Sequence, residues 1–419
     1  MTAAAPSSDA PDHRLALWSL TFGNVVIGTG ALAFVGMLDT IARDLRESPS
    51  AIGLIAGLFS LAICISGPPL GALTSRYDRR LVLTASLALF AVGHFAAAVA
   101  QGWWTLLLIR VLTAIAGTLF TPQAAATASL LVPARRRART MAFVFLGWSI
   151  AAVVGMPAGA LIASGSGWRT AMTCIGLLST VGALLVWWRL PQRLFVGRID
   201  RAAWQAIADH PTLLRVAGVT AIQASAQFTL YSYIVIAYRD TLLATPLMLT
   251  LLLSLNGLAG FAGNLVAGRV AERRGPPVVI HVALLSIAAA FVLWIVLFEV
   301  GPGPAGLAIA IVAAILWGAG NFGSNSMQQV RLVDLAPPLA SVSVALNTSA
   351  IYLGQFIGAA VGGLVLAHPF TSPPSMALPW VALPVFFVAI GMSIAAERRI
   401  ERIGASPATF SATCAHDAS

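Results

Sequence analysis

Apolar residues in this chain gather into long runs, and short polar connectors separate the runs. A membrane-spanning helix needs about 20 mostly apolar residues, and twelve runs reach that length. The pattern therefore predicts an all-α membrane protein with twelve transmembrane helices. The expected helices cover residues 15–41, 51–73, 81–100, 103–131, 141–163, 170–188, 216–237, 246–267, 277–298, 305–327, 340–367 and 376–395.

The chain is expected to consist of two six-helix halves. The longest polar stretch between apolar runs begins at Arg189. Motifs on its two sides repeat: Gly71 and Gly268 lie 197 residues apart, and Gly155 and Gly354 lie 199 apart. Duplicated halves are one of the known plans of transporters. The expected divisions are a tail at 1–14, halves at 15–188 and 216–396, a central loop at 189–215 and a tail at 397–419.

The composition places this chain in a lipid bilayer. Of its 419 residues, 58% are hydrophobic and only 10% are charged, whereas a soluble globular protein has about 25% charged residues. All 25 basic residues are arginine; with a cytoplasmic N-terminus, twenty fall on cytoplasmic connectors and four on outer ones. Cytoplasmic loops carry the excess of basic residues, so both termini are expected in the cytoplasm. The net charge of +10 thus reflects topology, and no nucleic-acid partner is expected.

Residues that usually carry catalysis or bind metals are sparse. Cys64, Cys174 and Cys414 lie far apart and form no CxxC pair, so neither a metal site nor a disulfide framework is expected. No nucleophile–base pair stands out, which leaves an enzyme as the least favoured class. We expect no cofactor.

Two short basic connectors occupy equivalent places in the two halves, each between the second and third apolar runs. Their charge keeps them out of the hydrocarbon, so they anchor the ends of the adjoining helices. A second function, as a gate whose ion pairs form in one conformation only, stays open. The residues concerned are Gly71, Arg76, Asp78, Arg79 and Arg80 in the first hairpin, and Gly268, Glu272, Arg273 and Gly275 in the second.

The two hairpins resemble the loop signature G-x-L-a-D-r-x-G-r of the major facilitator superfamily, which lies between spans 2 and 3 and, in a weaker form, between spans 8 and 9. The first copy departs from it at two positions, where Ser75 and Asp78 replace the usual Asp and Gly. The resemblance implies the major facilitator fold, in which two pseudo-symmetric halves surround a central cavity. It also implies transport by alternating access.

Arg110 lies inside an apolar run, about seven residues and therefore roughly 10 Å from its outer end. An arginine within the membrane usually faces the bundle interior, because exposure to lipid is costly. Arg110, followed by Gly117, resembles the R-x-x-x-G-type motif of span 4 in the superfamily. We expect Arg110 to face the cavity and act on the substrate or on a titratable neighbour. The alternative is a side chain that snorkels outward past Trp103 and Trp104.

Glycines in spans 5 and 11 form a second signature. Small residues four apart let helices approach closely, and a proline adds a kink. Packing alone would explain these residues. The pattern in span 5 also resembles G-x(7)-G-x-P-x-G of the antiporter branch, which implies that span 5 lies where the two halves meet. The residues are Gly147, Gly155, Pro157 and Gly159, with Gly354 and Gly358 in span 11.

Polar residues within the spans are candidates for a transport path. Three of them recur every fourth residue and share one helical face. Each alone is adequately explained as an interhelical hydrogen bond worth about 0.6 kcal/mol, but a cluster is better explained as a cavity wall. Segments of spans 7 and 11 also resemble the twelve-span drug:proton antiporter family. The candidates are Asn24, Gln223, Gln227, Tyr231, Asn321 and Asn325.

The first span lacks the acid that this family often carries. When Gly28 and Gly36 are lined up with the family's span-1 sequence, Ala31 stands where a Glu is usual. Asp39, near the outer end, is the acid that remains in the span. We therefore expect any proton coupling to run through Asp39 working with Arg110, with His94 as the next candidate. The alternative is that Asp39 only caps the span or pairs with Arg43.

These observations favour a monomeric secondary transporter in the bacterial inner membrane. The expected function is export of a small molecule, such as a drug-like compound, a sugar or a metabolite, in exchange for protons. An uncoupled facilitator or importer is the first alternative. The second is a membrane sensor that keeps the fold without transport.

Overall fold

A computed structural model of the chain describes residues 13–133, 136–195 and 201–403. Within these ranges every regular element is helical. Eleven helices are long and apolar enough to cross a membrane. The expected all-α membrane architecture is therefore confirmed.

The first six expected spans correspond to the first half of the chain. Spans 4 and 5 are each built from more than one helix. The helices are α1 (Arg14–Leu45), α2 (Pro49–Leu73), α3 (Arg79–Ala98), α4 (Trp103–Gly117) continued by α5 (Phe120–Leu130), α6 (Arg137–Ile150) continued by the π-helical turn η3 (Ala151–Gly155) and α7 (Met156–Ser166), and α8 (Trp168–Arg189).

The second half follows the short helix α9 (Arg201–Ala208). The seventh expected span, 216–237, is broken at Ser232 and Tyr233, and neither of its two parts is among the eleven long apolar helices. The helices are α10 (Pro211–Tyr231), α11 (Ile234–Leu242), α12 (Pro246–Arg274), α13 (Pro276–Val300), α14 (Pro304–Leu335), α15 (Ala340–Ala367) and α16 (Ala377–Ile403).

Local sequence sets many of the helix ends. Five of the helices that begin after a loop carry proline at one of their first two positions, where the missing N–H has no helical partner to lose. Ser48 caps α2 by accepting from the Ala51 N–H at 3.1 Å, and Thr245 caps α12 by accepting from the Met248 N–H at 3.3 Å. Such caps satisfy backbone donors that would otherwise have no partner at a helix start.

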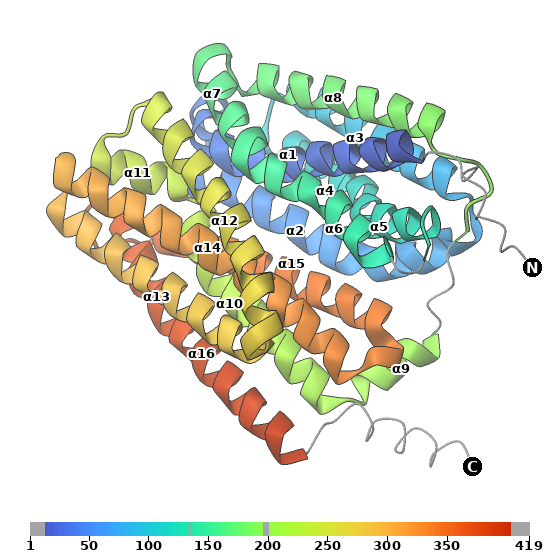
Figure 1. Cartoon of the computed structure of the whole chain (residues 1–419). Helices are drawn as coiled ribbons and strands as arrows, with labels where there is room; N and C mark the ends of the chain where they lie inside the picture. Colours follow the sequence, from blue (N-terminus) through green and yellow to red (C-terminus); the bar gives the residue numbers. More distant parts are fainter. Residues whose placement is uncertain (1–12, 134–135, 196–200, 404–419) are drawn as a thin grey trace, which may run out of the picture.

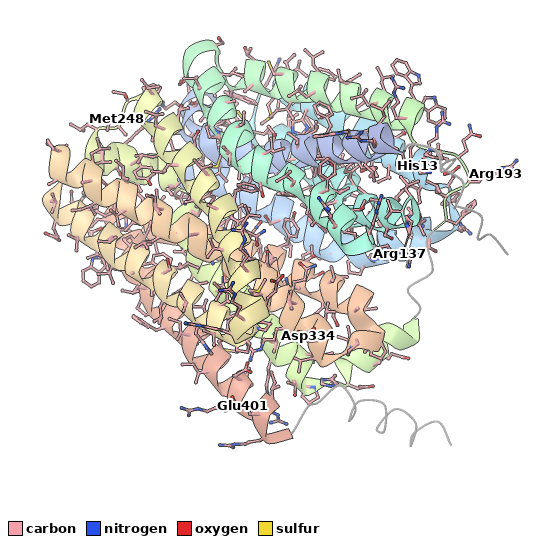
Figure 2. All side chains as sticks on the ribbon, in the orientation of Figure 1. His13, Arg137, Arg193, Met248, Asp334 and Glu401 are labelled. Atoms are coloured by element: carbon pink, nitrogen blue, oxygen red, sulfur yellow. The ribbon has the colours of Figure 1, made fainter. Side chains whose placement is uncertain are left out.

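The two halves lie side by side, blue to green in one and green to red in the other (Figure 1). Figure 2 places His13, Arg137, Arg193, Asp334 and Glu401 toward one end of the bundle, and Met248 at the other. We call the first the terminal end and the second the opposite end. Because α1 starts at the terminal end and α2 returns to it, the first basic hairpin also lies there.

The glycine signatures pack in the same way in the two halves. A Cβ atom at Gly155 would clash with Thr29 Oγ1 of α1, and one at Gly354 would clash with the Ala221 carbonyl oxygen of α10. Gly147, Gly159 and Gly358 likewise face α1 or α10, and Pro157 is buried. These glycines therefore join the first and fifth spans of each half. Span 5 is expected where the two halves meet, but its signature glycines pack within a half.

The first basic hairpin is tied to its own half. The Arg79 side chain is buried and donates to Gln123 Oε1 at 2.8 Å and to the Ser75 carbonyl oxygen at 2.9 Å. Asp78 caps α3 through the Arg80 N–H and accepts from the Arg193 N–H at 2.7 Å. Arg80 lies over the Trp187 ring. These contacts agree with anchoring, while the gate function of the hairpins stays a prediction.

The other hairpin residues make few contacts. Arg76 lies over the neighbouring Tyr77 ring, and a Cβ atom at Gly71 would come no nearer than 3.9 Å to Gln123. In the second hairpin a Cβ atom at Gly268 would meet open space, and Glu272 and Arg273 are exposed. Gly275 ends α12 with a φ of +81°, a conformation that side chains disfavour. The second hairpin therefore forms a tight turn at the surface.

Candidate transport cavity

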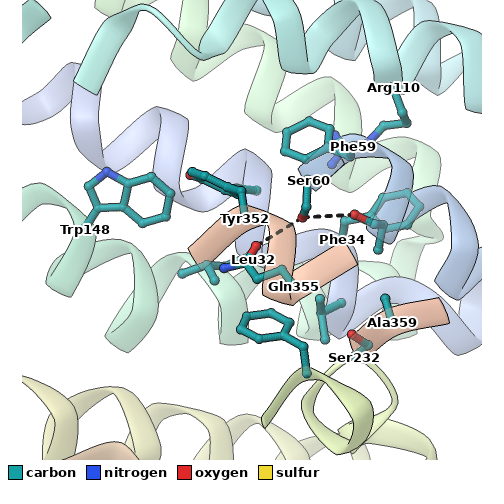
Figure 3. A pocket seen from close by; sticks show the side chains of 14 residues that line it. Leu32, Phe34, Phe59, Ser60, Arg110, Trp148, Ser232, Tyr352, Gln355 and Ala359 are labelled. Carbon is teal, nitrogen blue, oxygen red and sulfur yellow. Dashed lines mark hydrogen bonds between the residues drawn. The ribbon is translucent and has the colours of Figure 1, made fainter. Parts of the chain in front are cut away.

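A cavity of about 50 Å³ lies between the two halves (Figure 3). Residues of α1, α2, α4 and α6 line it from the first half, and residues at α10, its C-cap and α15 line it from the second. This volume holds a few water molecules and is far below the 300–1,000 Å³ of sites for drug-sized ligands. The halves must therefore separate for such a molecule to enter.

Arg110 forms part of the cavity wall and is only 1% exposed. Its Cζ lies 4.6 Å from the ring centre of Phe34 and 4.2 Å from that of Phe59. Cations are attracted to aromatic faces at such distances. The structure thus places Arg110 inside the bundle rather than at the surface past the tryptophans.

The polar partners of Arg110 are distant and uncharged. Its Nη2 donates to the Gly30 carbonyl oxygen at 3.3 Å, and its Nη1 lies 3.5 Å from His94 Nε2. Both distances exceed the usual 2.9–3.0 Å. The Arg110 Nε is buried and has no hydrogen-bond partner. The hydrogen-bonding capacity of the guanidinium is therefore incompletely satisfied.

His94 lies on α3 and is fully buried behind the cavity wall. Its Nδ1 lies 2.8 Å from the Phe90 carbonyl oxygen. Because that oxygen can only accept, Nδ1 carries the proton, and Nε2 is left with the lone pair that faces Arg110. A proton on Nε2 would remove this acceptor and repel the guanidinium, so the protonation of His94 and the position of Arg110 are linked.

Asp39 lies apart from Arg110 in this structure, so a joint role of the two residues stays a prediction. Its carboxylate pairs with Arg43 at 2.7 Å, the alternative that the sequence left open, and also with Arg239 of α11. Asp39 is not among the residues that line the cavity. The Asp39–Arg239 pair joins the two halves near the opposite end of the bundle.

The remaining candidates for the path lie outside the residues that line the cavity. Asn24 binds the Val144 carbonyl oxygen at 3.0 Å and ties span 1 to span 5. Gln223 donates to Ser324 Oγ at 2.6 Å, and Gln227 is buried beside it on α10. Asn325 donates to Asn321 on the same helix. In this conformation Asn24 and Gln223 join helices of one half, and the part of all these candidates in a path stays a prediction.

The two halves also meet through direct polar contacts near the cavity. Ser60 Oγ donates to Gln355 Oε1 at 3.1 Å (Figure 3). Tyr231 Oη donates to Met156 Sδ at 3.4 Å. Both contacts join α-helices of different halves, so both must break or change when the cavity opens.

The π-helical turn η3 also contacts the other half. A Cβ atom at Gly257 of α12 would lie 2.6 Å from the Ala152 carbonyl oxygen and 2.8 Å from Val153 Cα. Pro157 follows the turn, and π-helical turns of this kind often lie at functional sites. Span 5 thus does meet the other half, through the backbone of η3 rather than through its signature glycines.

Several cavity residues were not among the sequence candidates. Ser60, Trp148 and Ser232 line the cavity and were not singled out. Tyr352 and Gln355 of span 11, which do stand out as polar residues in an apolar run, line it as well. Single hydroxyl and aromatic residues in apolar runs carry no spacing signal. Arg239 was assigned to an outer connector by the sequence, and nothing in its surroundings pointed to Asp39, two hundred residues away.

Neutralising Asp39 is expected to weaken the contact between the two halves at the opposite end. The two side chains of the Asp39–Arg239 pair are 19% and 28% exposed, and an ion pair at such a surface stabilises by about 0.2–1 kcal/mol. Asp39→Asn should therefore shift the opening equilibrium up to about fivefold. Distances between spin labels on Ser166 and Leu243, in a cysteine-free background, measure this shift.

The control for this prediction is Arg43→Gln. Arg43 pairs with Asp39 on the same helix, so its loss removes no contact between the halves. Equal label distances in Asp39→Asn and in the parent protein would mean that the pair does not hold the halves together.

Comparisons with known proteins agree with this architecture. Residues 20–359 match the family model described as "Major Facilitator Superfamily". The chain is 28% identical over 357 residues to the "Inner membrane transport protein YdhP" of Escherichia coli K12, which covers 84% of this chain and 88% of the relative.

Solved structures of similar fold share little sequence with this chain. A "D-xylose-proton symporter" gives a TM-score of 0.75 at 15% identity, covering 91% of this chain and 97% of that one. A mutant form of the "nucleoside transporter NupG" gives 0.73 at 14%, covering 92% and 100%. A bacterial homologue of the lysosomal transporter Spinster, "in Inward-facing And Occupied Conformation", gives 0.72 at 16%, covering 94% and 98%. With a family model matched over most of its length, this chain belongs to the major facilitator superfamily.

Proposed function

We propose that this transporter exports a small molecule across the bacterial inner membrane by alternating access. The observation that supports this function best is the cavity, which both halves line. The Ser60–Gln355 and Asp39–Arg239 contacts join the two halves toward the opposite end and help to enclose it. Rocking of two halves about such a site exposes it to each side in turn. Because one chain supplies the whole cavity wall, we propose that it works as a monomer.

The membrane and the direction rest on resemblance. The relative from Escherichia coli is named an inner membrane transport protein, which supports the same membrane here. The glycine signature of span 5 resembles that of the antiporter branch, which supports export. The described part of the chain shows no cluster of three or more His, Cys, Asp or Glu residues that could hold a metal, and the proposal needs none.

Transport itself is tested by counterflow in proteoliposomes over a panel of labelled drugs, sugars, nucleosides and organic acids. Vesicles preloaded with an unlabelled substrate should accumulate its labelled form transiently. Vesicles with an Arg110→Ala variant provide the control. A panel without any protein-dependent flux would favour the sensor alternative.

Proton coupling is proposed to run through His94. Its imidazole faces Arg110, the one charged side chain that the described structure places against it. An imposed pH gradient should drive accumulation in the parent protein, whereas His94→Asn should keep downhill exchange and lose gradient-driven accumulation. If Asp39→Asn instead loses gradient-driven accumulation and His94→Asn keeps it, proton coupling runs through Asp39.

An uncoupled facilitator is the second candidate, and one observation favours it. Ala31 lines the cavity where relatives often carry an acid, and no carboxylate is among the lining residues that the structure describes. A parent protein that exchanges substrate but shows no accumulation in response to a pH gradient would establish the uncoupled facilitator.

The proposed orientation has both termini in the cytoplasm. Cys414 lies outside the described residues, and it should react with an impermeant thiol reagent only after the membrane of intact cells is permeabilised. A Cys414→Ser variant sets the background from Cys64 and Cys174, which are partly buried. Labelling of Cys414 from outside intact cells would reverse the topology.

A further inference from the structure

We infer that the central cavity takes a small monoanion with an aromatic or apolar body, and that Arg110 binds its anionic group. This inference rests on the proposed transport function and names the substrate class for the same cavity.

The charge of the cavity carries the inference. Arg110 is the one side chain with a permanent charge among the fourteen residues that line the cavity in the described structure. It is 1% exposed, and the described residues supply it no carboxylate partner. A buried charge without a counter-charge is costly. An anionic substrate would supply the missing charge.

The guanidinium is also free to bind. Its Nε has no hydrogen-bond partner, and its contacts with His94 and Gly30 are long, at 3.5 and 3.3 Å. A guanidinium presents its N–H groups as a fork that matches a carboxylate with two parallel hydrogen bonds. The Nε–H and one Nη–H can therefore donate to a carboxylate or sulfonate without breaking a strong existing bond.

Ala31 explains why the cavity is positive. It lines the same cavity as Arg110, and the carbonyl oxygen of its neighbour Gly30 accepts from Arg110. An acid at residue 31 would thus lie within reach of the guanidinium and neutralise it. With alanine there, the cavity repels cations and attracts anions.

The rest of the wall defines the body of the ligand. Trp148, Phe228 and Tyr352 contribute aromatic rings, while Ser60 and Gln355 contribute neutral hydrogen-bonding groups. These groups suit an aromatic or apolar body with few polar atoms. One arginine without a second cation in the wall suits a single negative charge.

An anionic substrate also bears on the energy source. The membrane potential is negative inside and drives a monoanion outward without a coupled proton. An anion that draws Arg110 away from His94 would, in addition, favour a proton on His94 rather than compete with it, which argues against exchange of the anion for a proton. The inference thus favours export driven by the membrane potential, without proton exchange.

The test is ligand binding to the purified protein, measured as a shift in melting temperature, since a ligand that binds the folded state stabilises it. The probes are three acids of increasing size: benzoate, 1-naphthoate and indole-3-acetate. Each is compared with its neutral amide and with the matching amine, and benzenesulfonate tests a second anionic group. We expect at least one acid to raise the melting temperature, and its amide and amine to have at least tenfold weaker effects.

Two variants locate the site. Arg110→Gln removes the charge, and Ala31→Glu supplies a competing carboxylate, so both should lose the response to acids. Arg110→Lys should keep part of it. Arg215→Gln, which removes an exposed arginine far from the cavity lining, should respond as the parent does. Equal binding of amides or amines, a full response in Arg110→Gln, or no response to any acid would each overturn the inference.

Binding and transport can fail separately. An acid that binds but shows no flux in proteoliposomes would contradict the transport proposal and leave the inference standing. Flux of neutral or cationic compounds, without acid binding, would contradict the inference and leave transport standing.

Discussion

Replacing Gly257 with alanine is expected to reduce transport at least tenfold while the protein still folds and inserts. The new Cβ would lie 2.6 Å from the Ala152 carbonyl oxygen and 2.8 Å from Val153 Cα. Carbon atoms pack at about 3.5–4.0 Å, so α12 and η3 would have to move apart by about 1 Å. These atoms belong to the backbone, and a change of side-chain rotamer cannot relieve the clash.

The effect should be confined to the conformation in which the halves meet. Gly257 and η3 belong to different halves, so each half can still fold around its own core. The measurement is the initial rate of counterflow per amount of inserted protein, together with the melting temperature in detergent.

A glycine without neighbours provides the control. A Cβ atom at Gly391 on α16 would have nothing within 4 Å. Alanine is favoured over glycine inside a helix by about 1 kcal/mol, so Gly391→Ala should transport normally and be at least as stable. Parent-like transport in Gly257→Ala would show that close contact at η3 is not needed for the cycle.

Replacing Arg110 with alanine is expected to slow transport at least tenfold. A hydrogen bond to a charged group contributes about 1.5–3 kcal/mol, so losing the substrate's contact with Arg110 should slow transport by roughly 10- to 100-fold. Arg110→Lys should recover only part of the rate, because an ammonium group keeps the charge but lacks the planar fork.

Stability separates this result from misfolding. Arg110 is buried without a carboxylate partner, and replacing buried ionic groups by apolar ones of similar volume is often neutral or stabilising. Arg110→Met should therefore melt no lower than the parent protein in detergent and transport as slowly as Arg110→Ala. Near-normal counterflow in this variant would mean that Arg110 only fills space between Phe34 and Phe59.

Hydropathy and charge determined the architecture without any knowledge of contacts. The bilayer is the solvent of this protein, so the need to bury about 20 apolar residues per span acts on each segment by itself. Eleven of the expected spans are present as long apolar helices. The seventh differs because it carries polar residues such as Gln223 and Gln227 and is broken before Tyr233, whose hydroxyl binds the Ala359 carbonyl oxygen at 2.8 Å. The hydropathy of a segment does not show where its helix is broken.

The interior position of Arg110 also followed from solvent preference, because an arginine in lipid is costly wherever its partners lie. The residues that contact Arg110 could not be predicted in this way. His94, Phe34 and Phe59 come from three helices, and only their packing brings these groups to one guanidinium. The same holds for Asp39, whose spacing revealed Arg43 four residues away but gave no sign of Arg239.

The sequence by itself thus determined the membrane environment, the helical architecture and the interior position of the buried charge, because each depends on how a segment partitions between water and lipid. The tertiary structure alone decided which residues line the cavity, which glycines join helices of one half and which ion pair joins the two. Those features depend on distances between segments far apart in the chain, and no local pattern records them.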